Sequence, residues 1–224
     1  IFFRYSSEKS IAYFIDNIRI IPVLENDKFS FVYKVTGYNT PKVESVYLKI
    51  VSGKSSFVDY IIFDTEHEPT VNDIPVFVIE ETKTDDSESR NTGVYQRATK
   101  FVYVDYFYPD TKKIMLYNLQ GGQKTFATET NIFGTKCFLT LGVEILGKTL
   151  ESSMTPWNNI DDLINFKSSM RRPPAGNVPI DITKTHNEIK VSGRLVKSNR
   201  LGHDTNIGAL SLICATIRML GWKN

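Results

Sequence analysis

The chain has 224 residues, of which 41% are hydrophobic and 23% are charged, and this suits one globular domain over residues 1–224. No apolar run approaches the length that crosses a bilayer, and the first residues lack the features of a signal peptide. We therefore expect a soluble cytoplasmic protein without membrane contact. Cys137 and Cys214 lie far apart, which excludes a disulfide framework and a zinc knuckle and predicts two buried thiols.

The charge changes sign along the chain. Residues 1–160 carry 17 Lys and Arg against 20 Asp and Glu, whereas residues 161–224 carry 10 against 5. A net charge of +2 is too small to indicate nucleic-acid binding by itself. An acidic front with a basic rear fits either a metal site in the first part with a polyanion-binding surface in the second, or ordinary variation of surface charge along a chain.

Hydrophobic periodicity predicts an α+β fold, with a mixed central β-sheet flanked by helices. An amphipathic pattern predicts a first helix over 6–21, and alternating β-formers then predict four strands. The sequence next predicts a helix ended by Pro109, a buried strand and a short helix with acids in its first turn. A basic hairpin and a C-terminal helix capped by Gly221 are expected after them. The expected ranges after the first helix are 29–38, 42–51, 56–64, 74–83, 90–110, 112–120, 161–172, 188–200 and 205–222.

Two of these strands end in charged residues. If 57–64 and 75–83 pair as an antiparallel hairpin, Asp59 lies opposite residues 80 and 81. Because side chains alternate along a strand, Glu81 and Lys83 share one face. We expect Asp59 to meet Glu81 there, while Glu80 remains an alternative because a bulge exchanges the two faces.

Two carboxylates held close together repel one another and need a cation. Carboxylate oxygens with water and phosphate oxygens are the ligands that Mg²⁺ prefers, and a lysine beside them can hold water or offset phosphate charge. Asp59, Glu81 and Lys83 therefore have the residue types that hydrolyse a phosphodiester. The other interpretation is a pair of solvated strand ends joined by a cross-strand ion pair.

Asp59 followed by Glu81-Thr82-Lys83 resembles the Asp…(Asp/Glu)-x-Lys signature of the restriction-endonuclease-like, or PD-(D/E)xK, nucleases. The resemblance covers roughly residues 1–120, and Val58 stands where the family usually has proline. It implies a restriction-endonuclease-like core, in which Asp59 and Glu81 bind Mg²⁺, with Mn²⁺ as a substitute, and Lys83 assists the nucleophile. It further implies metal contact through water by Glu8 on the first helix, and a site residue on the helix after the hairpin, matched by Gln96, with Lys100 on the same helix face.

Several basic and hydroxyl side chains are expected to contact DNA. They are Lys54, Ser55, Ser56, Lys100, Arg171, Arg172, Arg194, Lys197, Arg200 and His203.

The combined expectation is a Mg²⁺-dependent, sequence-specific endonuclease for double-stranded DNA, similar to type II restriction enzymes. One site per chain and two strands to cut imply a homodimer. Two alternatives remain open: a repair or recombination nuclease of the same fold, and a non-catalytic DNA-binding module.

Overall fold

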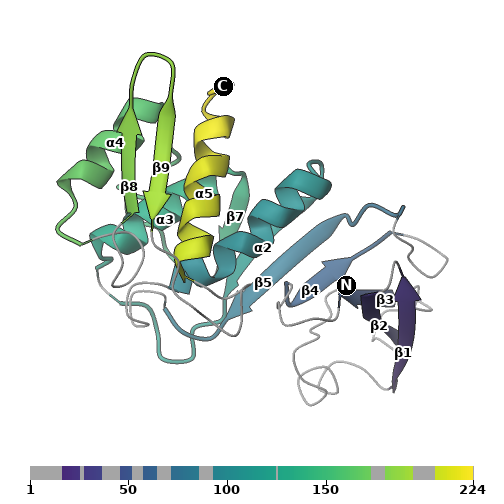
Figure 1. Ribbon diagram of the computed structural model, residues 1–224. Helices are drawn as coiled ribbons and strands as arrows, with labels where there is room; N and C mark the ends of the chain where they lie inside the picture. Colours follow the sequence, from purple (N-terminus) through teal and green to yellow (C-terminus); the bar gives the residue numbers. More distant parts are fainter. Residues whose placement is uncertain are drawn as a thin grey trace.

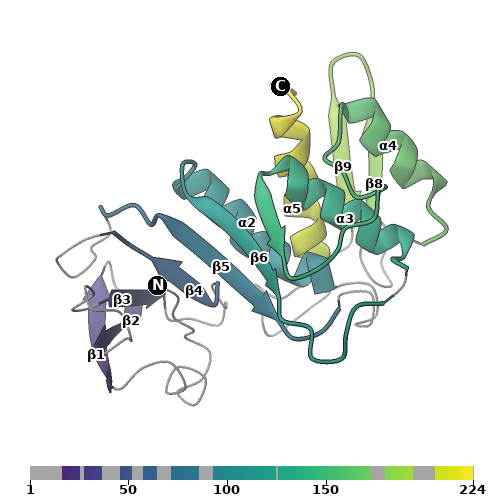
Figure 2. The ribbon, with the colours of Figure 1, turned by 180° about the vertical axis from the view of Figure 1, so that it is seen from behind.

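The computed structural model describes residues 17–25, 28–36, 46–51, 58–64, 72–85, 93–124, 126–172, 180–193 and 205–223, which form an α+β protein. Strands β1 (Asn17–Glu25), β2 (Lys28–Thr36) and β3 (Val46–Val51) make a three-stranded antiparallel sheet. Figures 1 and 2 show this small sheet beside the strand of residues 60–62, on the side remote from the hairpin of residues 180–193.

A four-stranded mixed sheet forms the centre of the molecule, in the order β4-β5-β6-β7. Strand β4 (Tyr60–Ile62) is antiparallel to β5 (Phe77–Thr82), and β5, β6 (Lys112–Tyr117) and β7 (Val143–Leu146) are parallel. Helix α2 (Gly93–Phe107) connects β5 to β6, and α3 (Glu129–Thr140) connects β6 to β7. Crossovers of this type are right-handed in nearly all proteins, which places successive helices on one face of the sheet.

The main hydrophobic core lies on this helix-covered face. Helix α5 (Thr205–Met219) packs across α2 and α3, and Figure 2 shows the sheet in front with α2 and α5 behind it. Apolar residues at helical spacing on α2 meet alternate residues of the strands, as expected for a helix layered on a sheet. The largest fully buried side chains are Tyr95, Phe101, Phe133, Phe138, Ile79, Met115, Leu141, Leu163 and Ile180.

The C-terminal third adds a second layer to α5. Helix α4 (Ile160–Ser169) begins at Asn159, whose side chain accepts a hydrogen bond from the Asp162 amide. The hairpin of β8 (Ile180–Lys184) and β9 (Ile189–Gly193) packs against α5 and is joined to α4 by exposed ion pairs. Residues 161–172, 180–193 and 205–223 of the basic part therefore fold against the same core as the central sheet.

Most expected elements are confirmed by the structure. These are the strands at β2, β3, β4, β5 and β6 and the helices α2, α4 and α5, with Gly221 at a positive φ of 98° just after α5. The prediction of a helix through residue 21 is wrong for 17–21, which belong to β1, while 1–16 lie outside the described residues. Of the hairpin expected over 188–200, residues 189–193 form the second strand of a hairpin whose first strand is 180–184, and 194–200 lie outside the described residues.

Helix α3 and strand β7 were not predicted. The buried side of α3 carries polar residues such as Thr130, Asn131 and Thr135 among its apolar ones, so the sequence shows no clear apolar stripe. Burial raises the pKa of Cys137 to about 12, whereas Cys214 is exposed, so the prediction of two buried thiols is wrong for Cys214. Among the described residues, no helix is long and apolar enough to span a membrane.

Helices α2 and α5 cross at very short range through Gly208. A Cβ atom at Gly208 would lie 1.7 Å from the Tyr95 carbonyl oxygen, and backbone atoms cannot yield as a flexible side chain can. We predict that Gly208→Ala lowers the free energy of unfolding by at least about 2 kcal/mol, although alanine favours helix formation. Urea unfolding followed by circular dichroism measures the change.

Gly121→Ala is the matched control because a Cβ atom there would meet nothing within 4 Å. Its effect should stay within about 0.5 kcal/mol. Equal stabilities for Gly208→Ala and the unmodified protein would contradict the close helix crossing.

Candidate functional site

The register of β4 and β5 decides which carboxylates share a face. Tyr60 pairs with Ile79, so the preceding residue, Asp59, lies opposite Glu80. Residues directly opposite in an antiparallel pair point to the same face, and neighbours along a strand point to opposite faces. Asp59 and Glu80 therefore share the face covered by α2, and the Glu81 side chain lies on the other.

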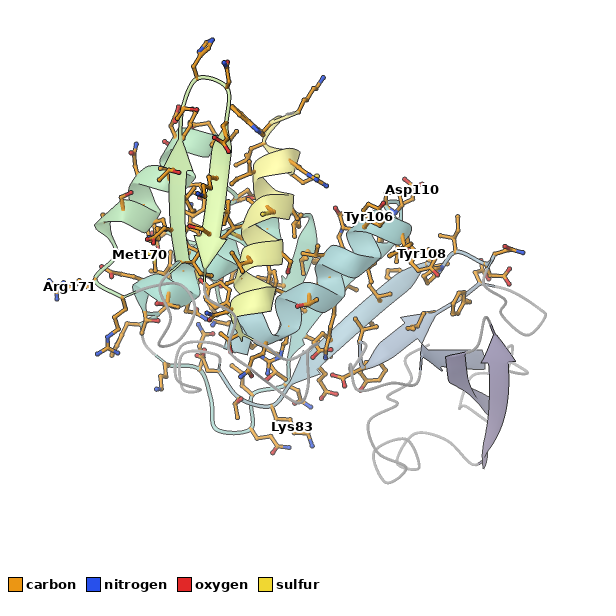
Figure 3. All side chains as sticks on the ribbon, viewed as in Figure 1. Lys83, Tyr106, Tyr108, Asp110, Met170 and Arg171 are labelled. Atoms are coloured by element: carbon orange, nitrogen blue, oxygen red, sulfur yellow. The ribbon has the colours of Figure 1, made fainter. Side chains whose placement is uncertain are left out.

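This register corrects the expected grouping of Asp59, Glu81 and Lys83. The Asp59 carboxylate accepts a hydrogen bond from the Glu81 backbone N–H at 2.9 Å, so it contacts the backbone of that residue. Lys83 follows the end of β5 and is exposed, and Figure 3 shows it at the lower edge of the molecule. The structure thus brings Asp59 to Glu80, the alternative acid.

Glu81 takes part in a different polar group. One carboxylate oxygen accepts a hydrogen bond from the Tyr60 hydroxyl at 2.7 Å and the other from the Asn118 side-chain amide at 3.0 Å. These bonds link β4, β5 and the segment after β6 on the sheet face away from α2. Both of these donors to the Glu81 carboxylate are neutral.

Two cations from α2 lie beside Glu80. The Lys100 ammonium donates to Glu80 Oε1 at 2.6 Å, and the Arg97 guanidinium Nε is 3.8 Å from the same oxygen. The Glu80 and Lys100 side chains are 6% and 5% exposed, so this ion pair is almost dry. Within the described part of the chain, the buried Glu80 Oε2 accepts no hydrogen bond.

Arg97 was missed by the sequence analysis. Its guanidinium donates to Thr82 Oγ1 at 3.0 Å, and Thr82 shares the face of Glu80. The three-residue spacing from Lys100 places both cations on one side of α2, which is a signal the sequence contains. Gln96 is half-buried on the same helix, and the described residues give it no hydrogen bond or ion pair.

The charge of Glu80 depends on opposing effects. Burial raises the pKa of Glu80 to about 7, and the neighbouring Asp59 adds to the rise, whereas Lys100 and Arg97 act to lower it. The largest effect is the loss of water around the carboxylate. A proton and a cation therefore compete for the Glu80 carboxylate near neutral pH.

A second buried ion pair lies where the parallel strands end. The Lys148 ammonium, after β7, donates to Asp85 Oδ1, after β5, at 3.0 Å, with side-chain exposures of 3% and 2%. Lys148 also lies 4.9 Å from the centre of the Tyr117 ring at the end of β6. The exits of all three parallel strands are thus held together.

Two of the expected DNA-contacting residues lie away from these acids. Arg171 and Arg172 are exposed after α4, and Figure 3 shows Arg171 well separated from Lys83. The Arg171 backbone N–H donates to Glu129 at 3.0 Å. Eight residues lie outside the described part of the chain: Glu8, Lys54, Ser55, Ser56, Arg194, Lys197, Arg200 and His203.

The raised pKa of Glu80 gives a pH dependence of stability. Between about pH 4.5 and 7 the folded state keeps a proton that the unfolded state has lost, so rising pH destabilises the fold at this residue. We predict that unmodified protein loses up to about 3 kcal/mol relative to Glu80→Gln across this window. Urea unfolding at several pH values, without divalent cations, measures the difference.

Glu81→Gln makes the same chemical change on the opposite face and serves as the control. If the free energy of unfolding of the unmodified protein, taken relative to that of Glu80→Gln, stays constant or increases as the pH rises, then Lys100 outweighs burial at Glu80.

Comparison of this chain with family models, with curated proteins and with solved structures finds no match in any of the three. The site is therefore interpreted from its own geometry and from the resemblance of its short motif.

Proposed function

We propose that this protein is a Mg²⁺-dependent endonuclease that hydrolyses phosphodiester bonds in double-stranded DNA, with Asp59, Glu80 and Lys100 at its active site. The observation that supports it best is the meeting of Asp59 and Glu80 across β4 and β5, with the Lys100 ammonium 2.6 Å from Glu80. Two acids and a lysine are the residue types of the nuclease signature. Here Glu80 takes the place of Glu81, and Lys100 that of Lys83.

The donor set fits a hard divalent cation. Asp59 and Glu80 supply carboxylate oxygens, and the buried Glu80 Oε2 has no hydrogen-bond donor among the described residues. The described residues contain no group of three close His, Cys, Asp or Glu side chains. A cation held by two carboxylates, with water and phosphate oxygens completing its shell, is typical of Mg²⁺. When bound, Mg²⁺ or Mn²⁺ would supply Lewis-acid polarisation of the phosphate.

Lys100 has two roles in this proposal. Its N–H groups hold the attacking water against the phosphate, and its charge offsets the negative charge that develops as the bond forms. Burial strengthens both effects, since the Lys100 side chain is only 5% exposed. Arg97, at 17% side-chain exposure, lies closer to solvent, where it adds positive charge for an incoming phosphate group.

The arrangement of elements supports a restriction-endonuclease-like core as the finer fold. An antiparallel hairpin carries the acids, and the next helix carries the lysine and leads into a parallel strand. With one such site per chain, cutting both strands of a sequence-specific target requires two chains. The proposal therefore includes a homodimer.

Cleavage of supercoiled plasmid in Mg²⁺ tests the proposal. We predict that Asp59→Asn and Glu80→Gln each lower the rate at least about a hundredfold, because each removes a metal ligand. Lys100→Met should lower it about 100- to 1000-fold through loss of the electrostatic contribution. Gel analysis of nicked and linear products gives the rates, and circular dichroism confirms that each variant is folded.

Glu81→Gln and Lys83→Ala are the matched controls, and each should retain activity within about tenfold. Full activity in Glu80→Gln together with loss of activity in Glu81→Gln would identify Glu81, and not Glu80, as the metal-binding acid. No cleavage by the unmodified protein, together with tight DNA binding, would favour a binding module. A preference for branched duplex would favour a repair or recombination nuclease.

A further inference from the structure

The segment after β6 runs directly alongside the exit of β5. The Asn118 N–H donates to the Thr82 carbonyl at 2.8 Å, and the Gln120 N–H donates to the Lys83 carbonyl at 3.3 Å. The Lys124 N–H reaches the Asp85 carboxylate at 3.0 Å. We name residues 118–124 the exit loop. These bonds fix the exit loop to β5, the strand that carries Glu80 two residues before Thr82.

The exit loop is rigidly held at its far end as well. The Gln123 side chain donates to the Thr149 carbonyl at 2.6 Å and accepts from the Thr149 N–H at 2.7 Å. The buried pair of Asp85 and Lys148 fastens the strand exits on which the exit loop rests. Few degrees of freedom remain for its backbone, and a binding surface that is already ordered loses less entropy when a partner binds.

The outward side of the exit loop has the chemistry of base recognition. Residues 118, 120, 121, 122, 123 and 124 are all exposed, and the side chains among them are amides and a lysine. A glutamine or asparagine amide can donate to and accept from one adenine edge in the major groove, and a lysine can contact a backbone phosphate. Added Cβ atoms at Gly121 or Gly122 would meet nothing, so a duplex can approach closely there.

The two glutamines of the exit loop are used differently. Both ends of the Gln123 amide are occupied by Thr149. The Gln120 side chain is exposed, and the described residues include no hydrogen-bond partner for it. One glutamine therefore anchors the loop, and the other presents its amide to solvent beside the candidate site.

We propose that the exit loop reads base edges next to the cleaved phosphate and that Gln120 is a specificity-determining residue that selects adenine. The inference rests on the proposed nuclease function and adds to it the element that chooses the target. The physical basis is distance: a loop hydrogen-bonded to Thr82 and Lys83 reaches base pairs adjacent to a phosphate held at Glu80. Asn118 is committed to Glu81 at 3.0 Å, which leaves Gln120 as the amide that faces outward.

The test is a binding selection from randomised duplex DNA with Asp59→Asn, which keeps the exit loop unchanged. We predict an enriched sequence containing at least one A·T pair that Gln120→Ala, made in the same background, no longer prefers. Discrimination at that position should fall roughly five- to hundredfold, the range for one bidentate base contact. Affinity for unselected DNA should change less than about twofold.

Asn187→Ala is the control, because Asn187 is an exposed amide in the turn between β8 and β9. It should leave the enriched sequence unchanged. The same preference in Gln120→Ala, no enriched sequence, or no DNA binding at all would each overturn the inference. Plasmid cleavage by the unmodified protein is measured separately. If the unmodified protein cleaves DNA and Gln120→Ala keeps the same sequence preference, the inference about Gln120 is wrong while the nuclease proposal stands.

Discussion

The ion pair between Glu80 and Lys100 sets the organisation of the site. Transferring two charges into a dry layer is costly, and the cost is offset only when the charges contact each other in good geometry. Here the contact is 2.6 Å, and it joins the middle of β5 to the middle of α2. Arg97 with Thr82, and Lys113 with Asp105, repeat this link on either side. Helix α2 is therefore attached to the sheet by these polar contacts as well as by apolar packing against β6.

The charged contacts between β5 and α2 lie apart from the apolar core that stabilises the molecule. The core formed by α2, α3 and α5 contains the large buried aromatic residues and the close crossing at Gly208. The charged layer lies at the β4 edge of the sheet, where Asp59 crowds Glu80 and one carboxylate oxygen has no donor among the described residues. An arrangement that leaves like charges close together costs stability, and such arrangements are frequent where a protein binds a cation or does chemistry.

Side-chain contacts hold the carboxyl ends of the parallel strands in place. Asp85, Lys148 and Tyr117 hold three strand ends together, and Gln123 ties the exit loop to Thr149. In sheets with parallel strands, ligands commonly bind at the carboxyl ends of the strands, where the connecting loops converge. The candidate acids, the cations of α2 and the exposed amides of the exit loop all lie close to these ends. In the proposed nuclease, catalysis and target choice would share this edge of the sheet.

The sequence by itself determined the α+β class, the acidic hairpin of β4 and β5, and the helix that follows it, because alternation and helical periodicity are local properties. It also contained both candidate acids, but it could not choose between Glu80 and Glu81, because a shift of one residue in strand pairing moves every side chain to the other face. Only the tertiary structure brought Lys100 and Arg97 to Glu80 and joined Asp85 to Lys148. Those contacts depend on how separate elements pack, and the energy of a buried charge is set by neighbours that lie far away in the sequence.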